Sequence, residues 1–391
     1  MKYFSYLNTA VSIIKAYSGE IPFNLFIKNF FSANKKYGSK DRKQIAGLCY
    51  NYFRLGHSVS QLDREEKIIT GAFLCEENHS AFLQAVRPEW NEKILLSLAE
   101  KIIIVNNDFT IDSIFPWRDE LSENVDPTSF SVSFLKQPLL YLRTRPGKEI
   151  IVKEKLTHAG LQFDQPYANC ISLPNNSKVT ELILVDKEAV VQDLNSQKIG
   201  EFIQLAVDEI PSEISAWDCC AASGGKSILL HDLAAGKLDL TVSDIRPSII
   251  NNLKERFKRA GVKNYKSFIA DLSLADRRLP TARYDFILCD APCTGSGTWA
   301  RTPENLCFFE KEKIEYYASL QKKILNNSIP LLAESGYFIY ITCSVFKKEN
   351  EEAVKFIKNE FKLELVNMEL LKGYDKEADS MFAALFKKPG H

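Results

Sequence analysis

Residues 215–230 are SAWDCCAASGGKSILL, and this stretch decides the fold class. It begins with a short apolar segment at 215–219 and passes through a loop of small residues that contains Gly224 and Gly225. An apolar segment that suits a helix to Ala235 follows. Strand, glycine-containing loop and helix are the first unit of an α/β fold, in which a mostly parallel sheet is covered on both faces. The sequence therefore predicts a Rossmann-like domain in this half of the chain.

The same alternation of strand and helix continues to the C-terminus. Pro247 suits the first turn of a helix and Gly261 its end. A long helix with one apolar face is expected around Ile314–Ile324. Further strands are predicted at 240–243, 267–270, 284–289 and 337–341.

Each predicted strand ends at a polar or reactive residue. In open parallel sheets, ligands bind beyond the carboxyl ends of the strands. Five such residues in succession predict one shared crevice. They are Asp218, Asp244, Asp271, Asp290 and Cys343.

The first loop and the second and third of these strand ends suit a nucleoside cofactor. Small residues let a backbone approach a ligand closely, and the following helix offers free N–H groups to an anionic group. Asp244 is placed to accept hydrogen bonds from ribose hydroxyls, and Asp271 to receive an adenine amino group or to cap a helix. A nucleotide-binding P-loop is excluded because Cys220 stands where its first glycine is required.

Two cysteines are expected at neighbouring strand ends. Cys293 lies in the segment after Asp290, and Cys343 ends the next strand. A single cysteine is more often a core residue than a catalyst. Two thiols over a cofactor crevice favour nucleophilic chemistry.

Three domains are expected. Residues 1–130 are predicted to be helical, 137–195 to form a small mixed α/β domain, and 196–391 to form the Rossmann-like domain. The first 60 residues hold nine Lys and Arg, Arg54 among them, against only Glu20 and Asp41. Such a basic surface suits either a phosphate backbone or plain solvent.

Composition narrows the class of protein. The 391 residues are 45% hydrophobic and 26% charged, which is typical of a globular protein. No apolar run approaches the ~20 residues that span a bilayer, and the first segment is expected to be an amphipathic helix without export. The nine cysteines contain no pair of CxxC units, so no metal site is predicted. A reduced cytoplasmic monomer is expected.

These motifs resemble the Sun/Fmu-type RNA cytosine-5 methyltransferase family, whose members include a 16S ribosomal RNA enzyme. Segments 190–197 (VVQDLNSQ) and 380–388 (SMFAALFKK) are also similar to that family, and 38–54 resembles the NusB-like RNA-binding domain of some members. Ser223 and Ser227 depart from its usual proline and threonine. The central resembling motifs are CCAASGGKS (219–227), VSDIRP (242–247), FIAD (268–271), DAPCTGSGTWARTP (290–303) and YITCSV (340–345).

The resemblance implies S-adenosyl-L-methionine as cofactor, with Asp244 on its ribose and Asp271 near its adenine. Asp290 would lie between cofactor and base, Cys343 would be the nucleophile, and Cys293 the second cysteine. The loop residues implied to line the cofactor are Cys220, Ala221, Ala222, Ser223, Gly224, Gly225 and Lys226.

The implied reaction makes 5-methylcytosine in RNA. A thiolate of Cys343 adds to carbon 6, Asp290 bonds at N3, and Cys293 helps to remove the carbon 5 proton. Partial ionisation requires a lowered pKa for Cys343. The base must be unpaired, so a loop or an immature RNA is expected, with ribosomal RNA favoured and rRNA processing as the role.

Other functions remain open from the sequence. They are a tRNA cytosine-5 methyltransferase, a non-catalytic RNA-binding ribosome assembly factor, an amino-group methyltransferase and a DNA cytosine methyltransferase. The last would use Cys293 as its nucleophile and would not need Cys343.

Overall fold

The computed structural model describes residues 2–105, 109–211, 213–274 and 282–390, and the chain divides into two compact units. The first comprises Met1–Asp119, Asp126–Gln137 and Trp299–Lys311. The second comprises Glu120–Val125, Pro138–Thr298 and Glu312–His391.

The first unit is helical in its regular structure, as residues 1–130 were expected to be. Its helices expose polar faces and bury apolar ones, such as Leu7 and Ile13 of α1. Ser80 caps α5, because its side chain accepts from the backbone N–H of Leu83 at 3.1 Å. The helices are α1 (Lys2–Ala16), α2 (Phe23–Ala33), α3 (Ser39–Arg54), α4 (Arg64–Cys75), α5 (Ala81–Val86), α6 (Pro88–Glu92), α7 (Leu98–Val105), α8 (Pro127–Ser133) and α13 (Glu304–Phe308).

Two features of this unit differ from the sequence prediction. The segment Trp299–Lys311 was expected in the Rossmann-like domain but belongs to the first, helical unit. Its Trp299 packs against Phe115 of that unit, with 6.0 Å between the ring centroids. Arg54, counted with the basic surface, is buried, and its guanidinium donates to the carbonyl oxygens of Phe134 and Lys136. Arg54 therefore holds the helical unit together and does not face solvent.

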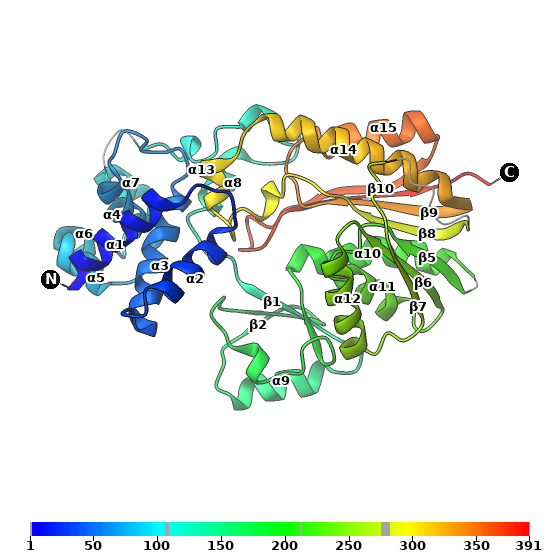
Figure 1. The fold of residues 1–391 in the computed structure, drawn as a ribbon, viewed down its shortest axis with the longest axis horizontal. Helices are drawn as coiled ribbons and strands as arrows, with labels where there is room; N and C mark the ends of the chain where they lie inside the picture. Colours follow the sequence, from blue (N-terminus) through cyan, green and yellow to red (C-terminus); the bar gives the residue numbers. More distant parts are fainter. Residues whose placement is uncertain (1, 106–108, 212, 275–281, 391) are drawn as a thin grey trace. The chain divides into compact units, whose positions relative to one another are not determined.

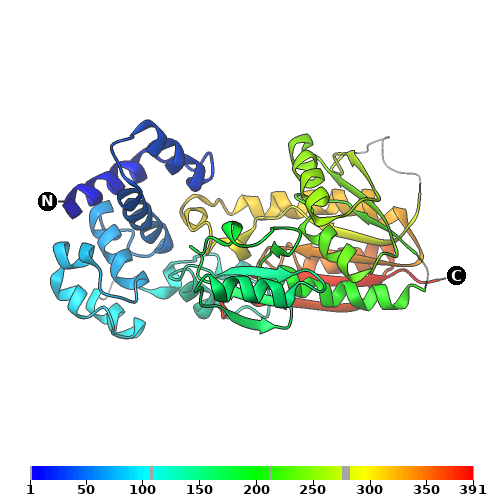
Figure 2. The ribbon, with the colours of Figure 1, turned by 90° about the horizontal axis from the view of Figure 1, so that it is seen from below.

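The second unit begins with a four-stranded antiparallel sheet in the order β2-β3-β1-β4. Helix α9 (Glu149–His158) packs on one face of this small sheet (Figure 2). Its side chains Val152 and Leu156 are fully buried there. The strands are β1 (Leu140–Thr144), β2 (Asp164–Tyr167), β3 (Cys170–Leu173) and β4 (Ala189–Val191).

A seven-stranded sheet in the order β10-β11-β9-β8-β5-β6-β7 follows in the same unit. The central strands run parallel, and β11 is antiparallel to both of its neighbours. The chain fills the sheet from β5 to β7 on one side and then continues at β8 on the other. The strands are β5 (Ile214–Asp218), β6 (Leu238–Asp244), β7 (Tyr265–Ile269), β8 (Tyr284–Asp290), β9 (Leu332–Thr342), β10 (Glu364–Leu371) and β11 (Met381–Lys387).

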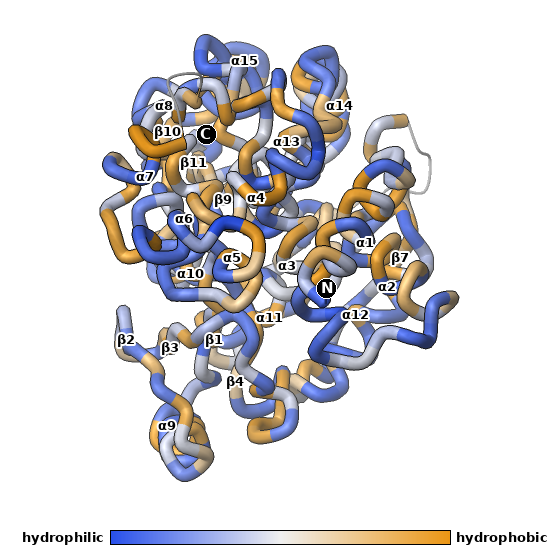
Figure 3. The backbone as a smooth tube through the Cα atoms, turned by 90° about the vertical axis from the view of Figure 1, so that its left-hand side faces the viewer, coloured by the Kyte–Doolittle hydropathy of each residue, from blue (hydrophilic) through white to orange (hydrophobic). Residues whose placement is uncertain are grey.

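Helices cover both faces of this sheet (Figure 1). Helices α10 (Leu194–Glu209), α11 (Gly225–Leu233) and α12 (Pro247–Ala260) lie on one face, and α14 (Glu312–Ser328) and α15 (Glu351–Phe361) on the other. Strand β11 is buried along most of its length, and the hydrophobic colour follows it in Figure 3. This is the Rossmann-like architecture that the sequence predicts.

The predicted ends of helix α12 are confirmed. Pro247 occupies the first turn of α12, and Gly261 ends that helix with a left-handed φ of 77°. In the described parts of the chain, no helix combines the length and the apolar character that crossing a membrane requires.

Candidate active site

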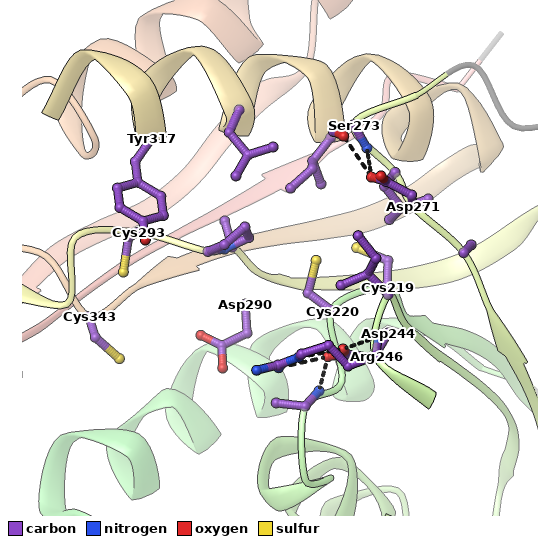
Figure 4. Close-up of a pocket in the computed structure, with 18 of the residues that line it drawn as sticks. Cys219, Cys220, Asp244, Arg246, Asp271, Ser273, Asp290, Cys293, Tyr317 and Cys343 are labelled. Carbon is purple, nitrogen blue, oxygen red and sulfur yellow. Dashed lines mark hydrogen bonds and ion pairs between the residues drawn. The ribbon is translucent and has the colours of Figure 1, made fainter. Parts of the chain in front are cut away.

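The carboxyl ends of the parallel strands meet at one edge of the large sheet. The break in strand order lies there, between β5 and β8, which is where ligands bind in such folds. A cavity of about 610 Å³ opens at this edge, a size that suits a nucleoside ligand. Its lining includes Asp244, Asp271, Asp290, Cys293 and Cys343. Figure 4 shows the two cysteines and Asp290 at one end of this cavity, and Asp271 towards the other.

The loop after β5 takes its shape from glycine. Gly224 has a φ of +82°, and a Cβ atom there would lie 2.7 Å from Cε1 of Phe257. Any other residue is therefore both strained and obstructed. The backbone N–H of Ala222 donates to Oδ2 of Asp244 at 3.1 Å, which ties this loop to the end of β6.

Asp244 and Asp271 both reach the cavity, but each already accepts hydrogen bonds. Asp244 is 7% exposed and accepts from Nε of Arg246 at 3.0 Å. Asp271 accepts from the backbone N–H and the hydroxyl of Ser273, at 2.9 and 2.6 Å. Their roles toward ribose and adenine stay predictions, and a ribose at Asp244 would compete with Arg246.

Lys226 and Asp290 form an ion pair at the centre of the site. Nζ of Lys226 donates to Oδ2 of Asp290 at 2.6 Å, and both side chains are largely shielded from solvent. Burial alone would lower the pKa of Lys226, but the charge of Asp290 raises it above its usual value. Lys226 therefore stays protonated and holds the carboxylate in place.

Asp290 and Cys343 stand between two cavities. The second, of about 260 Å³, is also lined by Asp193, Lys226 and Asp379. Lys226, which the family resemblance implies as a cofactor-lining residue, lines this second cavity and not the first. Among the loop residues of that prediction, Cys220 and Ala222 line the larger cavity. The smaller cavity is lined by Ala221, Ala222, Ser223, Gly225 and Lys226.

The predicted lowered pKa of Cys343 is wrong for this structure. Burial and the nearby carboxylate of Asp290 raise the pKa of Cys343 to about 12, although Lys226 opposes this. Burial, followed by the charge of Cys343, also raises the pKa of Cys293 well above its ordinary value. Both groups are therefore neutral thiols near neutral pH.

Glu349 connects the two cysteine loops, and sequence reasoning missed it. It is fully buried and accepts hydrogen bonds from the backbone N–H and the hydroxyl of Thr294, at 2.9 and 2.6 Å. It also accepts from Nε2 of Gln321 at 3.3 Å and from the hydroxyl of Ser344. Thr294 follows Cys293 and Ser344 follows Cys343, so one carboxylate fixes both loops. Its position six residues after Cys343 was the available signal.

Two arginines of α12 have internal partners. Arg256 and Arg259 both bind the buried carboxylate of Asp186, at 2.9 and 2.8 Å. Asp186 has a positive φ of 68° and is 1% exposed. This cluster therefore fixes the connection between the small sheet and α12.

Comparisons with known proteins agree with this fold. The family model described as 16S rRNA methyltransferase RsmB/F matches residues 205–386. A "Probable ribosomal RNA small subunit methyltransferase B" of Bacillus subtilis (strain 168) is 29% identical over 167 residues, which are 43% of this chain and 36% of that protein. A protein of the same name from Coxiella burnetii is 28% identical over 324 residues, 79% of this chain and 67% of that protein.

Solved structures give the same result for the fold alone. The crystal structure of PH0851 has a TM-score of 0.71 at 18% identity and covers 98% of each chain. A methyltransferase homolog protein from Pyrococcus horikoshii has a TM-score of 0.56 at 23% identity, over 69% of this chain and 92% of that one. The predicted Rossmann-like fold is therefore confirmed.

Proposed function

We propose that residues 205–386, which match the family model described as 16S rRNA methyltransferase RsmB/F, methylate carbon 5 of cytosine in ribosomal RNA. The observation that carries the proposal is the pair of thiols, Cys293 and Cys343, beside the Lys226–Asp290 ion pair. A base-directed methyltransferase that acts on an amino group has no use for two thiols at this place.

The larger cavity suits S-adenosyl-L-methionine, which supplies an electrophilic methyl group on a sulfonium. The positive φ of Gly224 lets the loop beside the cavity pass close to Phe257, at a point where a Cβ atom would collide with that ring. The carboxylate of Asp244 is the candidate for the ribose hydroxyls, and Asp271 for the adenine amino group. The carboxyl group of Asp290, which lines the same cavity near Cys343, is the candidate to contact the base where it meets the methyl group.

Cys343 is the proposed nucleophile. Its sulfur forms a bond to carbon 6 of cytosine, which breaks the aromaticity of the ring and makes carbon 5 nucleophilic. Because Cys343 begins as a thiol of high pKa, its proton must leave as the sulfur attacks, and Lys226 is the nearby cation that favours the thiolate. The carboxylate of Asp290 accepts the proton of Cys343 and donates it to N3 as negative charge moves into the ring.

Cys293 is proposed to act after methyl transfer. The proton on carbon 5 passes to a water molecule beside Cys293, and the electron pair of that C–H bond re-forms the ring double bond. The sulfur of Cys343 then leaves carbon 6 and takes back its proton from N3 through Asp290, so that the ring regains its aromaticity. Assistance of this kind is typically worth about 10²–10⁴ in rate. Glu349 holds both cysteine loops through Thr294 and Ser344, so it supports the geometry without touching the base.

The test measures methyl transfer to an RNA substrate, under reducing conditions, by one variant of each cysteine. Cys343→Ala should abolish methyl transfer, and Cys293→Ala should accumulate a covalent protein–RNA adduct that is visible on a denaturing gel. Cys75→Ala, at a half-buried cysteine outside the catalytic unit, is the matched control and should keep wild-type activity. Unchanged activity of Cys343→Ala would refute the assignment of the nucleophile.

The substrate is tested separately. Methylation of 16S rRNA, tRNA and single-stranded DNA should be compared at the same concentration, with bisulfite sequencing to locate the product. Preference for tRNA or DNA would overturn the ribosomal substrate while leaving the cytosine chemistry intact. Absence of transfer to every substrate, with RNA still bound, would favour a non-catalytic assembly factor.

A further inference from the structure

Three cysteine thiols converge beside the larger cavity. The sulfur atoms of Cys219, Cys220 and Cys289 all lie within 4.8 Å of one another. Cys219 and Cys289 are buried, whereas Cys220 is partly exposed. Across the described stretches of the chain, this is the one group of three or more potential metal ligands whose donor atoms converge in this way.

The sheet brings these thiols together. Strands β5 and β8 are parallel neighbours in which Asp218 lies opposite Leu288, so Cys219 and Cys289 are the next residues on each strand. The backbone N–H of Cys219 donates to the carbonyl oxygen of Leu288 at 2.9 Å. The chain turns directly after β5, and the thiols of Cys219 and Cys220 then point to the same side (Figure 4).

We propose that Cys219, Cys220 and Cys289 form a binding site for a thiophilic divalent metal ion of the zinc class. Zinc bonds thiolate sulfur at about 2.3 Å in tetrahedral geometry, which requires sulfur atoms about 3.8 Å apart. The three sulfurs therefore need to approach one another by no more than about 1 Å. Small side-chain rotations supply such a movement.

The charge of the site favours a divalent ion over a monovalent one. Three thiolates with a divalent ion leave one net negative charge, whereas a monovalent ion leaves two. Added negative charge is costly beside the carboxylates of Asp218 and Asp290, because the site is buried. The thiol protons are released to solvent on binding, and the affinity for metal therefore rises with pH.

The site also has a consequence for the cofactor, and this part depends on the proposed function. Cys220 lines the larger cavity and belongs to the loop assigned to the cofactor. Three protein ligands leave a fourth position open, and the exposed side of Cys220 faces the cavity. Metal at this site and cofactor in the cavity are therefore expected to exclude one another.

The experiment titrates metal into the reduced, metal-free full-length protein in the absence of RNA. Cd²⁺ is the optical probe, followed by its thiolate absorption, and Zn²⁺ is measured by competition with a chromophoric chelator. One equivalent should bind, and Cys289→Val should weaken binding at least tenfold. Cys220→Ser, at a partly exposed position, gives the same test if the buried substitution impairs folding.

The double variant Cys293→Ser/Cys343→Ser is the matched control, because it removes the other two thiols that line the cavity. It should bind Cd²⁺ as the wild type does. Loss of binding in this control, or wild-type binding by Cys289→Val and Cys220→Ser, would overturn the proposal.

The linkage to the cofactor is measured by calorimetry with S-adenosylhomocysteine. One equivalent of Zn²⁺ should weaken its binding to the wild type at least tenfold and leave its binding to Cys220→Ser unchanged. Equal weakening in both proteins would refute the exclusion. If S-adenosylhomocysteine does not bind without metal, the proposed function fails, whereas the Cd²⁺ titration still decides the metal site.

Discussion

Replacement of Lys226 by methionine separates the charge of this side chain from its bulk. Lys226 and Asp290 lie 2.6 Å apart and are shielded from solvent, with exposed fractions of 11% and 24%. Removing one partner of such a charge pair typically costs about 2–5 kcal/mol, because the other charge is left unpaired. If this loss falls on the transition state, the rate of methyl transfer drops by about 30- to 4,000-fold, since each 1.4 kcal/mol is a factor of ten.

The same substitution should move the pH dependence of the reaction. Lys226 lowers the pKa of Cys343, which burial and Asp290 raise to about 12. Without that cation the thiolate of Cys343 is less stable. The rate of methyl transfer should therefore fall, and its rise with pH should shift to higher pH. The assay is single-turnover methyl transfer to RNA between about pH 6 and pH 9.

Two controls make the result interpretable. Lys226→Arg keeps the charge and should retain most of the pH profile, although its fork-shaped group fits the site less well. Lys254→Met removes an exposed lysine of α12 and should behave as the wild type. The reasoning is refuted if Lys226→Met keeps more than half of the wild-type rate with an unshifted profile.

Two further predictions concern buried carboxyl groups. Glu349→Gln keeps the size of the side chain but weakens the bonds from Thr294 and Gln321, so kcat should fall about tenfold with KM for the cofactor unchanged, as steady-state kinetics would show. An unchanged kcat would remove its positioning role. Asp218 is 1% exposed, and burial raises its pKa to about 7. Because its folded pKa is raised, the stability it contributes is present below about pH 4 and lost as pH rises through about 7. Wild type should therefore lose about 3 kcal/mol more stability than Asp218→Asn between about pH 5 and pH 8. Urea unfolding at both pH values measures this, and parallel losses would contradict it.

The ends of helices and strands were predictable because they depend on local chemistry. Pro247 and Gly261 have backbone preferences that mark the two ends of α12, and both lie where expected. The aspartates at the strand ends also follow from order along the chain, since parallel strands place their carboxyl ends at one edge. The segment at 299–311 was misassigned, because its aromatic side chains pack with helices that are distant in sequence.

The sequence by itself determined the parallel sheet, its order of strands and helices, and the residues that reach its edge. These follow from periodicity, glycine and proline, which act over a few residues. Only the tertiary structure decided how those residues are paired and ionised. Lys226 meets Asp290 and Glu349 joins the two cysteine loops, while burial raises the pKa of Cys343. Contact across strands and exclusion of water arise only when the whole sheet is packed, so no local pattern in the chain encodes them.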